Sequence, residues 1–215
     1  MVCSKAPLLS MENEAALKGN SMNEKIATVG EVCRISSKQS GWALFLFKLI
    51  REIKPNSCLE MGTCLGISAS YQAAALKVNG TGNLTTLEGA KSRVEVAEEN
   101  FRKLGLDNIH AISGSFQDNL EKVLEEKKPI DFAFIDGHHD EHATIQYFYQ
   151  IYPYLSTDYA VLIFDDIGWS RGMRRAWKTI SHSQEVKINV DKFYMGICVV
   201  SKDSMARKDF RIALY

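Results

Sequence analysis

Three aspartates and one histidine stand where two apolar runs of the sequence end. Asp136 ends the run IDFAFID and is followed three residues later by His139, and the pair Asp165 and Asp166 ends the run YAVLIFD. Carboxylates gathered in a cleft repel one another unless a cation lies between them, and all-oxygen ligands suit Mg²⁺, Ca²⁺ or Mn²⁺. Histidine titrates near neutral pH and can act as a general base. Together the four residues predict metal-assisted chemistry, although any one histidine of DGHHDEH also fits an ordinary solvated loop.

A second candidate site lies earlier in the sequence, in the stretch EMGTCLGIS from Glu60 to Ser68. Its two glycines, Gly62 and Gly66, allow a tight turn in which backbone amides approach a ligand. The next apolar run, NLTTLE, ends in Glu88, and a carboxylate there can accept both hydroxyls of a ribose. The glycines alone also fit a plain strand-to-helix turn, so Glu88 carries most of the prediction of a cofactor site.

The elements that must position these residues alternate in type along the chain. The strands are expected at residues 57–61, 83–88, 108–113, 130–136, 159–165, 185–190 and 193–200. Helical patterns cover residues 40–53, 66–78, 90–104, 116–127 and 141–154. This alternation predicts an α/β fold with a mostly parallel sheet and helices on both faces. The three aspartates should converge, because parallel strands end at the same edge of a sheet.

The last two expected strands are too close in sequence to be parallel. Only Asp191 and Lys192 separate them, which leaves no room for a crossover helix. The sequence therefore predicts a seven-stranded sheet that ends in an antiparallel C-terminal hairpin. That outline is typical of the Rossmann-like class I methyltransferases, whereas a plain dinucleotide-binding sheet stays parallel throughout.

Over roughly residues 40–200, the motifs EMGTCLGIS, TTLE and GSFQD resemble the S-adenosylmethionine site of the catechol and caffeoyl-CoA type O-methyltransferases. The resemblance implies that Ser68 holds the methionine carboxylate and that Glu88 binds the ribose. The turn from Gly114 to Gln117 would pack along the adenine, although Phe116 also fits ordinary core packing. The cofactor contacts implied in this way are Glu60, Gly62, Thr63, Gly66, Ser68, Glu88, Gly114, Ser115, Phe116 and Asp136.

The acidic residues match the metal ligands of the same family. Its members carry Asp on the fourth strand and Asp-Asn on the fifth, where this chain has Asp136, Asp165 and Asp166. Asp166 replaces the Asn of the catechol enzymes, and His139 replaces their lysine. Both departures resemble the macrolide-sugar O-methyltransferases, which implies His139 as general base beside Asp136, with Mg²⁺ as the expected ion. In many methyltransferases, however, the acid at the position of Asp136 lines the pocket without binding a metal.

Two further residues follow the Asp pair, in DDIGWSRGMRRAW. Trp169 and Arg171 would face a molecule bound at the metal, and Arg171 could pair with an anionic acceptor. Alternatively, Arg171 belongs to the solvated face of a helix whose buried face includes Met173 and Trp177.

The whole chain has a balanced charge, with 26 lysines and arginines against 26 aspartates and glutamates. We therefore expect a small-molecule partner with a hydroxyl group (a sugar, phenol or natural product) and neither nucleic acid nor a membrane. The five cysteines form no CxxC pair and are expected as reduced thiols, which indicates a cytoplasmic protein.

The length of 215 residues suits one domain. We assign residues 40–215 to an S-adenosylmethionine-binding domain and residues 1–39 to a helical cap. The sequence is compatible with a homo-oligomer. Two alternatives stay open at this point: an NAD(P)-dependent Rossmann oxidoreductase, and a catalytically silent protein that binds S-adenosylmethionine.

Overall fold

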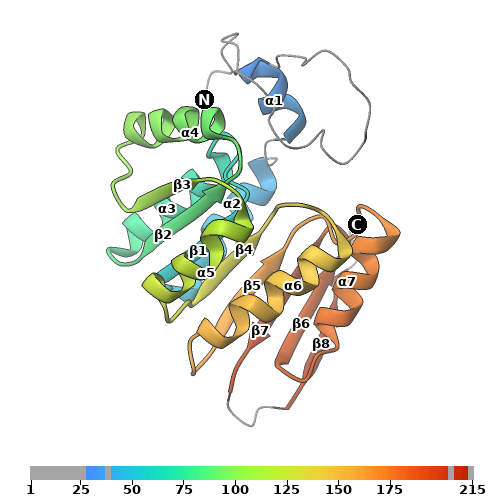
Figure 1. Cartoon of the computed structure of the whole chain (residues 1–215). Coiled ribbons are helices and arrows are strands. Elements are labelled where there is room, and N and C mark those ends of the chain that lie inside the picture. Colours follow the sequence, from blue (N-terminus) through green and yellow to red (C-terminus); the bar gives the residue numbers. More distant parts are fainter. Residues whose placement is uncertain (1–27, 37–39, 203–205, 213–215) are drawn as a thin grey trace. The chain divides into compact units, whose positions relative to one another are not determined.

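The computed structural model describes residues 28–36, 40–202 and 206–212. Figure 1 shows the helices and strands of these residues. The chain divides into two compact units. Unit 1 consists of Met1–Lys54 and Gly62–Asn119, and unit 2 consists of Pro55–Met61 and Leu120–Tyr215. Most of the predicted cap, residues 1–39, lies outside the described residues.

Unit 1 alternates strands and helices as predicted. Its strands β2 (Asn83–Glu88) and β3 (Ile109–Ser113) pair in parallel, from Leu84 opposite Ile109 to Glu88 opposite Ser113. Its helices are α1 (Val29–Ser36), α2 (Ser40–Ile53), α3 (Ile67–Asn79) and α4 (Lys91–Lys103). A further helix, α5 (Phe116–Lys127), begins in unit 1 and continues into unit 2.

Unit 2 contains a mixed sheet with the strand order β1-β4-β5-β7-β6-β8. The pairs β1–β4 and β4–β5 are parallel, and the pairs β5–β7 and β7–β6 are antiparallel, which confirms the predicted C-terminal hairpin. The strands are β1 (Ser57–Met61), β4 (Phe132–Ile135), β5 (Ala160–Phe164), β6 (Val186–Lys192), β7 (Met195–Val200) and β8 (Lys208–Arg211). The helices are α6 (Glu141–Ile151), the short 3₁₀-helix η1 (Tyr152–Tyr154) and α7 (Arg171–Ser181). Strand β8, which is parallel to β6, was not predicted.

The hairpin turn lies two residues beyond its predicted position. Strand β6 continues through Asp191 and Lys192, and the turn consists of Phe193 and Tyr194. The Asp191 carboxylate accepts a hydrogen bond from the Phe193 backbone N–H at 3.1 Å, and Phe193 has a positive φ of 56°. The prediction of a turn at Asp191 and Lys192 was therefore wrong.

Helix α7 buries Met173 and Trp177, as the alternative interpretation of Arg171 predicted. Their exposed fractions are 2% and 4%, whereas Arg171 is exposed. The Trp177 indole lies directly over Gly196 of β7, where an added Cβ would be 2.5 Å from the ring atom Cζ3. The absence of a side chain at Gly196 thus fixes how closely α7 approaches the sheet.

We expect Gly196→Ala to destabilise the fold by about 1–3 kcal/mol, because the methyl group overpacks a buried contact. Urea unfolding followed by circular dichroism measures the change. Gly41→Ala is the matched control, since a Cβ at Gly41 of α2 meets nothing within 4 Å. If both variants unfold at the urea concentration of the parent protein, the close approach of Trp177 to β7 is not required for stability.

Three cysteines, Cys58, Cys64 and Cys198, are free thiols, as predicted. Burial raises the pKa of the Cys58 and Cys198 thiols well above the usual range. Cys33 is disulfide-bonded, so the prediction of reduced cysteines was wrong for this residue. Among the helices of the described ranges, none is long and apolar enough to cross a membrane.

Candidate functional site

The glycine turn of unit 1 needs glycine for two physical reasons. Gly62 and Gly66 have positive φ values of 111° and 80°, a region that side chains disfavour. The Gly62 N–H donates to the Leu87 carbonyl of β2 at 2.9 Å, which ties the turn to the strand that ends in Glu88. A Cβ at Gly66 would lie 2.5 Å from Cε1 of Phe101 in α4. Packing by α4 therefore requires Gly66 independently of any ligand.

Glu88 is held at this turn by the backbone. Its side-chain oxygens accept hydrogen bonds from the Cys64 N–H at 2.8 Å and from the Ala90 N–H at 3.0 Å, and the Arg93 guanidinium lies 3.7 Å away. The residue is only 7% exposed. An ionised carboxylate can accept about four hydrogen bonds, so Glu88 retains acceptor capacity for a ligand with paired hydroxyls.

Two predicted cofactor residues near Glu88 are buried inside unit 1. The Thr63 hydroxyl forms a hydrogen bond of 2.6 Å with the Thr86 hydroxyl of β2, and Thr63 is 1% exposed. Ser68, near the start of α3, is 5% exposed. The contact with Thr86 gives Thr63 a structural role in this region.

The turn after β3 lies beside Glu88, as its predicted role requires. The Gly114 N–H donates to the Glu88 carbonyl at 2.9 Å, and Gly114 has a φ of 127°. The Ser115 hydroxyl accepts from the Asp118 N–H at 3.1 Å at the start of α5, which is the geometry of a helix cap. Phe116 is half-buried. Ser115 thus has a structural function whether or not it contacts a cofactor.

Helix α1 packs onto the glycine turn in unit 1. Val32 of α1 and Leu65 of the turn are the buried members of a small apolar cluster. Partly buried residues complete it: Val29, Cys33, Cys64 and Val96. The described part of the predicted cap therefore covers the turn that carries the candidate cofactor residues.

Glu60 and Asp136, the other residues predicted to contact the cofactor, belong to unit 2. Glu60 lies within β1 opposite Phe134 and is fully buried. The Asp136 N–H donates to the Met61 carbonyl at 2.8 Å, directly beyond the end of β4.

The pairing of β4 and β5 explains why the acidic residues of unit 2 converge. Ile135 and Phe164, the last residues of the two strands, are register partners. The Asp165 N–H donates to the Ile135 carbonyl at 2.9 Å. Asp136 and Asp165 thus leave the sheet side by side, at the carboxyl edge where the sequence placed them.

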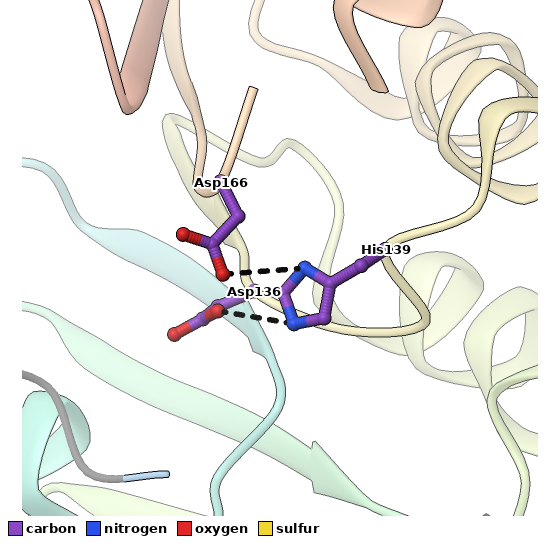
Figure 2. A group of neighbouring side chains, drawn as sticks. All are labelled: Asp136, His139 and Asp166. Carbon is purple, nitrogen blue, oxygen red and sulfur yellow. Dashed lines mark ion pairs between the residues drawn. The ribbon is translucent and has the colours of Figure 1, made fainter. Parts of the chain in front are cut away.

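The side chains that meet at this edge are Asp136, His139 and Asp166 (Figure 2). His139 Nε2 lies 3.9 Å from an Asp136 oxygen, and His139 Nδ1 lies 3.7 Å from an Asp166 oxygen. One donor atom from each residue falls within 4.8 Å of the others. Asp165, which was predicted as a third metal ligand, is 4% exposed and is not a member of this group.

The backbone is unusual at two of these three residues. His139 and Asp166 have positive φ values of 42° and 52°, and the neighbouring His138 has a φ of 61°. Histidine and aspartate tolerate this conformation better than most residues, yet it costs free energy that the surrounding structure must offset. Asp166 adopts this conformation directly after Asp165, and the two consecutive carboxylates differ in burial: Asp165 is 4% exposed, whereas Asp166 is half-buried.

The spacing of the three donors fits a divalent cation. Two oxygen ligands on opposite sides of Mg²⁺ lie about 4.2 Å apart, and Ca²⁺ separates them by roughly 5 Å. The Mg²⁺ spacing falls within the 4.8 Å that limits the distances between the donor atoms, whereas the Ca²⁺ spacing of roughly 5 Å exceeds it. Asp136 and Asp166 would supply the hard oxygen ligands, and His139 stands close enough either to coordinate the ion or to take a proton beside it.

The loop after β5 is fixed by the hairpin turn and carries exposed aromatic residues. The Ile167 N–H donates to the Tyr194 carbonyl at 3.0 Å. The Trp169 ring lies 6.4 Å from the His139 ring, centre to centre, and Trp169 is 70% exposed. Phe193 and Tyr194 are also exposed, at 50% and 46%. The sequence pointed to Trp169, but it missed the two turn residues because they were expected inside a strand.

His138 has a different environment from His139. Its Nδ1 is hydrogen-bonded to the Tyr147 hydroxyl, and the two rings are nearly parallel, with an interplanar angle of 8°. Burial, and secondarily the charge of Asp140, raises the pKa of Tyr147 to about 12. The Asp140 carboxylate caps α6 by accepting from the Ala143 N–H at 3.0 Å. His138 and Asp140 therefore have structural contacts that organise the loop around His139.

The sequence matches a family model described as a methyltransferase domain over residues 59–167, just over half of the 215 residues. It is also similar to a catechol O-methyltransferase of Niastella koreensis, with 32% identity over 132 residues. That match covers 60% of this chain and 57% of the relative, so the chain spans little more than half the length of that protein.

Solved structures show the same fold. An O-methyltransferase from Bacillus cereus in complex with SAH superimposes with a TM-score of 0.65 at 24% identity, covering 78% of this chain and 84% of that one. TomG, an O-methyltransferase from Streptomyces achromogenes involved in tomaymycin synthesis and solved with SAM, gives a TM-score of 0.62 at 21% identity. This match covers 77% of the present chain and 82% of TomG. The chain thus has the Rossmann-like α/β fold of these enzymes.

Proposed function

Because the chain belongs to the methyltransferase domain family, we propose that it transfers the methyl group of S-adenosylmethionine to a hydroxyl group of a small molecule. The observation that carries this proposal is the convergence of Asp136, His139 and Asp166 at the carboxyl edge of β4 and β5. A methyltransferase that acts on a hydroxyl needs such a group of residues, because a neutral alcohol is a poor nucleophile.

The cofactor part of the proposal rests on unit 1. Glu88 is buried, oriented by two backbone N–H groups, and placed beside the turns of Gly62–Gly66 and Gly114. We assign it to the ribose hydroxyls, with the remaining predicted contacts around it. Relatives of the same fold were solved with SAH and with SAM, which supports the choice of cofactor.

The acceptor chemistry is assigned to unit 2. A divalent cation, with Mg²⁺ as the expected ion, would be held by Asp136 and Asp166 and would lower the pKa of a bound acceptor hydroxyl. His139 accepts the hydroxyl proton at an imidazole nitrogen, while the Asp136 and Asp166 carboxylates, each near one of the two ring nitrogens, stabilise the resulting imidazolium. The oxygen then forms a bond to the methyl carbon as the bond from that carbon to sulfur breaks, and S-adenosylhomocysteine leaves. Trp169 offers an exposed aromatic surface beside His139 for a sugar, a phenol or a related natural product.

The two alternative functions, an oxidoreductase and a catalytically silent protein, would each use only part of the candidate site. A nicotinamide-dependent oxidoreductase would use the glycine turn and Glu88 but not the group at Asp136, and its family is not the one that matches. A catalytically silent protein would bind the cofactor without needing His139.

Methyl transfer from labelled S-adenosylmethionine to a panel of sugars and phenols tests the proposal directly. Cofactor binding without transfer to any acceptor class would favour the silent protein.

Replacing Glu88 by Ala should weaken binding of S-adenosylhomocysteine at least tenfold. The substitution removes a buried, charged acceptor, and hydrogen bonds to charged groups contribute about 1.5–3 kcal/mol. Isothermal titration calorimetry measures the affinity, with Glu99→Ala as control because Glu99 of α4 is an exposed acid paired with Lys103. An unchanged affinity in a folded Glu88→Ala protein would exclude Glu88 from the cofactor site.

A further inference from the structure

Strand β8 is an exposed edge of the sheet in unit 2. It is the last strand in the strand order (Figure 1). All four of its residues, Lys208–Arg211, are exposed. Two large apolar side chains lie on or directly after it: Phe210 is 50% exposed and Ile212 is 49% exposed. An edge strand presents unpaired backbone N–H and C=O groups that can pair with another strand.

The pairing of β8 with β6 determines which backbone groups face outward. Val190 and Phe210 are register partners, and the Ile212 N–H donates to the Asp191 carbonyl at 3.0 Å. In a strand, the main-chain groups of successive residues point to opposite sides. Because Phe210 and Ile212 direct theirs toward β6, the N–H and C=O groups of Asp209 and Arg211 point away from the sheet.

We propose that β8 pairs antiparallel with β8 of a second copy of this chain, in a register centred on Phe210. This register places Asp209 opposite Arg211 of the second copy and repeats the same pair by two-fold symmetry. Both residues have outward backbone groups, so each such pair forms two main-chain hydrogen bonds. The two Phe210 side chains then face each other at a non-hydrogen-bonded position, where cross-strand side chains approach most closely.

The charges of Asp209 and Arg211 favour this register over the two adjacent registers. A two-fold axis at Asp209 would place two aspartates opposite each other, and an axis at Arg211 would place two arginines opposite each other. Like charges directly opposite are destabilising in an antiparallel pair, and opposite charges are stabilising. The sequence Asp-Phe-Arg on an outward edge is thus complementary to itself, as a symmetric dimer contact requires.

The local contacts of Asp209 are compatible with the pairing. Its carboxylate accepts from Asn189 of β6 and from Arg207 Nε at 3.0 Å, which holds the side chain in place on the sheet. A carboxylate has further acceptor capacity for the Arg211 guanidinium of the second copy. Asp209, Phe210 and Arg211 also line one surface cavity of about 500 Å³ beside α7.

The test is sedimentation velocity of the whole chain over a range of concentrations. We expect a reversible monomer–dimer equilibrium for the parent protein. Arg211→Asp places Asp opposite Asp209, and Asp209→Arg places Arg opposite Arg211, so each variant alone should have a dimer Kd raised roughly tenfold or more. An equimolar mixture of the two variants restores opposite charges at both positions. The mixture should therefore form a heterodimer, detected with a size tag on one variant.

Lys122→Asp is the matched control, because it makes the same change of charge at an exposed position of α5. Circular dichroism and binding of S-adenosylhomocysteine verify that each variant is folded. A parent protein that stays monomeric at all concentrations would overturn the proposal. So would a dimer that Arg211→Asp leaves intact, or folded single variants that fail to associate with each other when mixed.

Discussion

The rate of methyl transfer in a single turnover is expected to fall by about 10²–10⁴ when His139 is replaced, the usual contribution of acid–base catalysis. Asn is the better substitution than Ala, because His139 has a positive φ of 42° and asparagine tolerates this conformation. Affinity for S-adenosylhomocysteine should stay close to that of the parent protein, because His139 is not among the residues predicted to contact the cofactor. A loss confined to turnover would identify His139 as part of the chemistry.

His142→Asn is the control for this experiment. His142 lies three residues further along the chain, on the exposed side of α6. Its replacement should leave the rate unchanged. If His139→Asn retains the rate of the parent protein on an accepted substrate, His139 is a loop residue and the proton has another acceptor.

Removal of divalent cations with EDTA should abolish methyl transfer, and added Mg²⁺ should restore it. The reason is electrostatic: two neighbouring carboxylates beside an imidazole cannot lower the pKa of a hydroxyl without a cation. Calorimetric binding of S-adenosylhomocysteine should survive the chelator nearly unchanged. Full activity in excess EDTA would remove the metal from the mechanism and leave the aspartates as residues that line the acceptor site.

Substitution of the two consecutive aspartates tests which of them binds the ion. The structure groups Asp166, and not Asp165, with Asp136 and His139. Asp166→Asn should therefore raise the Mg²⁺ concentration needed for half-maximal rate at least tenfold, and Asp165→Asn should change it less. The reverse order would show that Asp165 binds the ion and that the side chains rearrange when the metal binds.

Most of the fold could be predicted, because its elements have strong local patterns. The helix Ser40–Ile53 and the strands Ser57–Met61 and Asn83–Glu88 have the predicted bounds, since apolar periodicity and flanking turn residues agree there. Strand β8 could not be predicted in this way. Lys208–Arg211 is short, polar and exposed, and it becomes a strand only because the edge of β6 offers backbone partners.

The misplaced hairpin turn has a similar cause. Asp191 and Lys192 are polar and suit a turn, whereas Phe193 and Tyr194 suit a strand. The actual turn is set by contacts far away in sequence, such as the hydrogen bond from the Ile167 N–H to the Tyr194 carbonyl. The sequence likewise placed Asp136, Asp165 and Asp166 at one edge, but it could not show that a positive φ separates Asp166 from Asp165.

The contact between Gly66 and Phe101 affects how active and inactive relatives of this chain can be distinguished by their sequences. Since the aromatic ring of α4 occupies the space that a Cβ would need, selection for a stable fold alone would retain this glycine after catalysis is lost. A descendant that has become a mere cofactor sensor would thus still carry the glycine motif and would be mistaken for an enzyme. His139 and Asp166 hold a backbone conformation that costs free energy, so drift should erase them first, and their presence is the better marker of an active lineage.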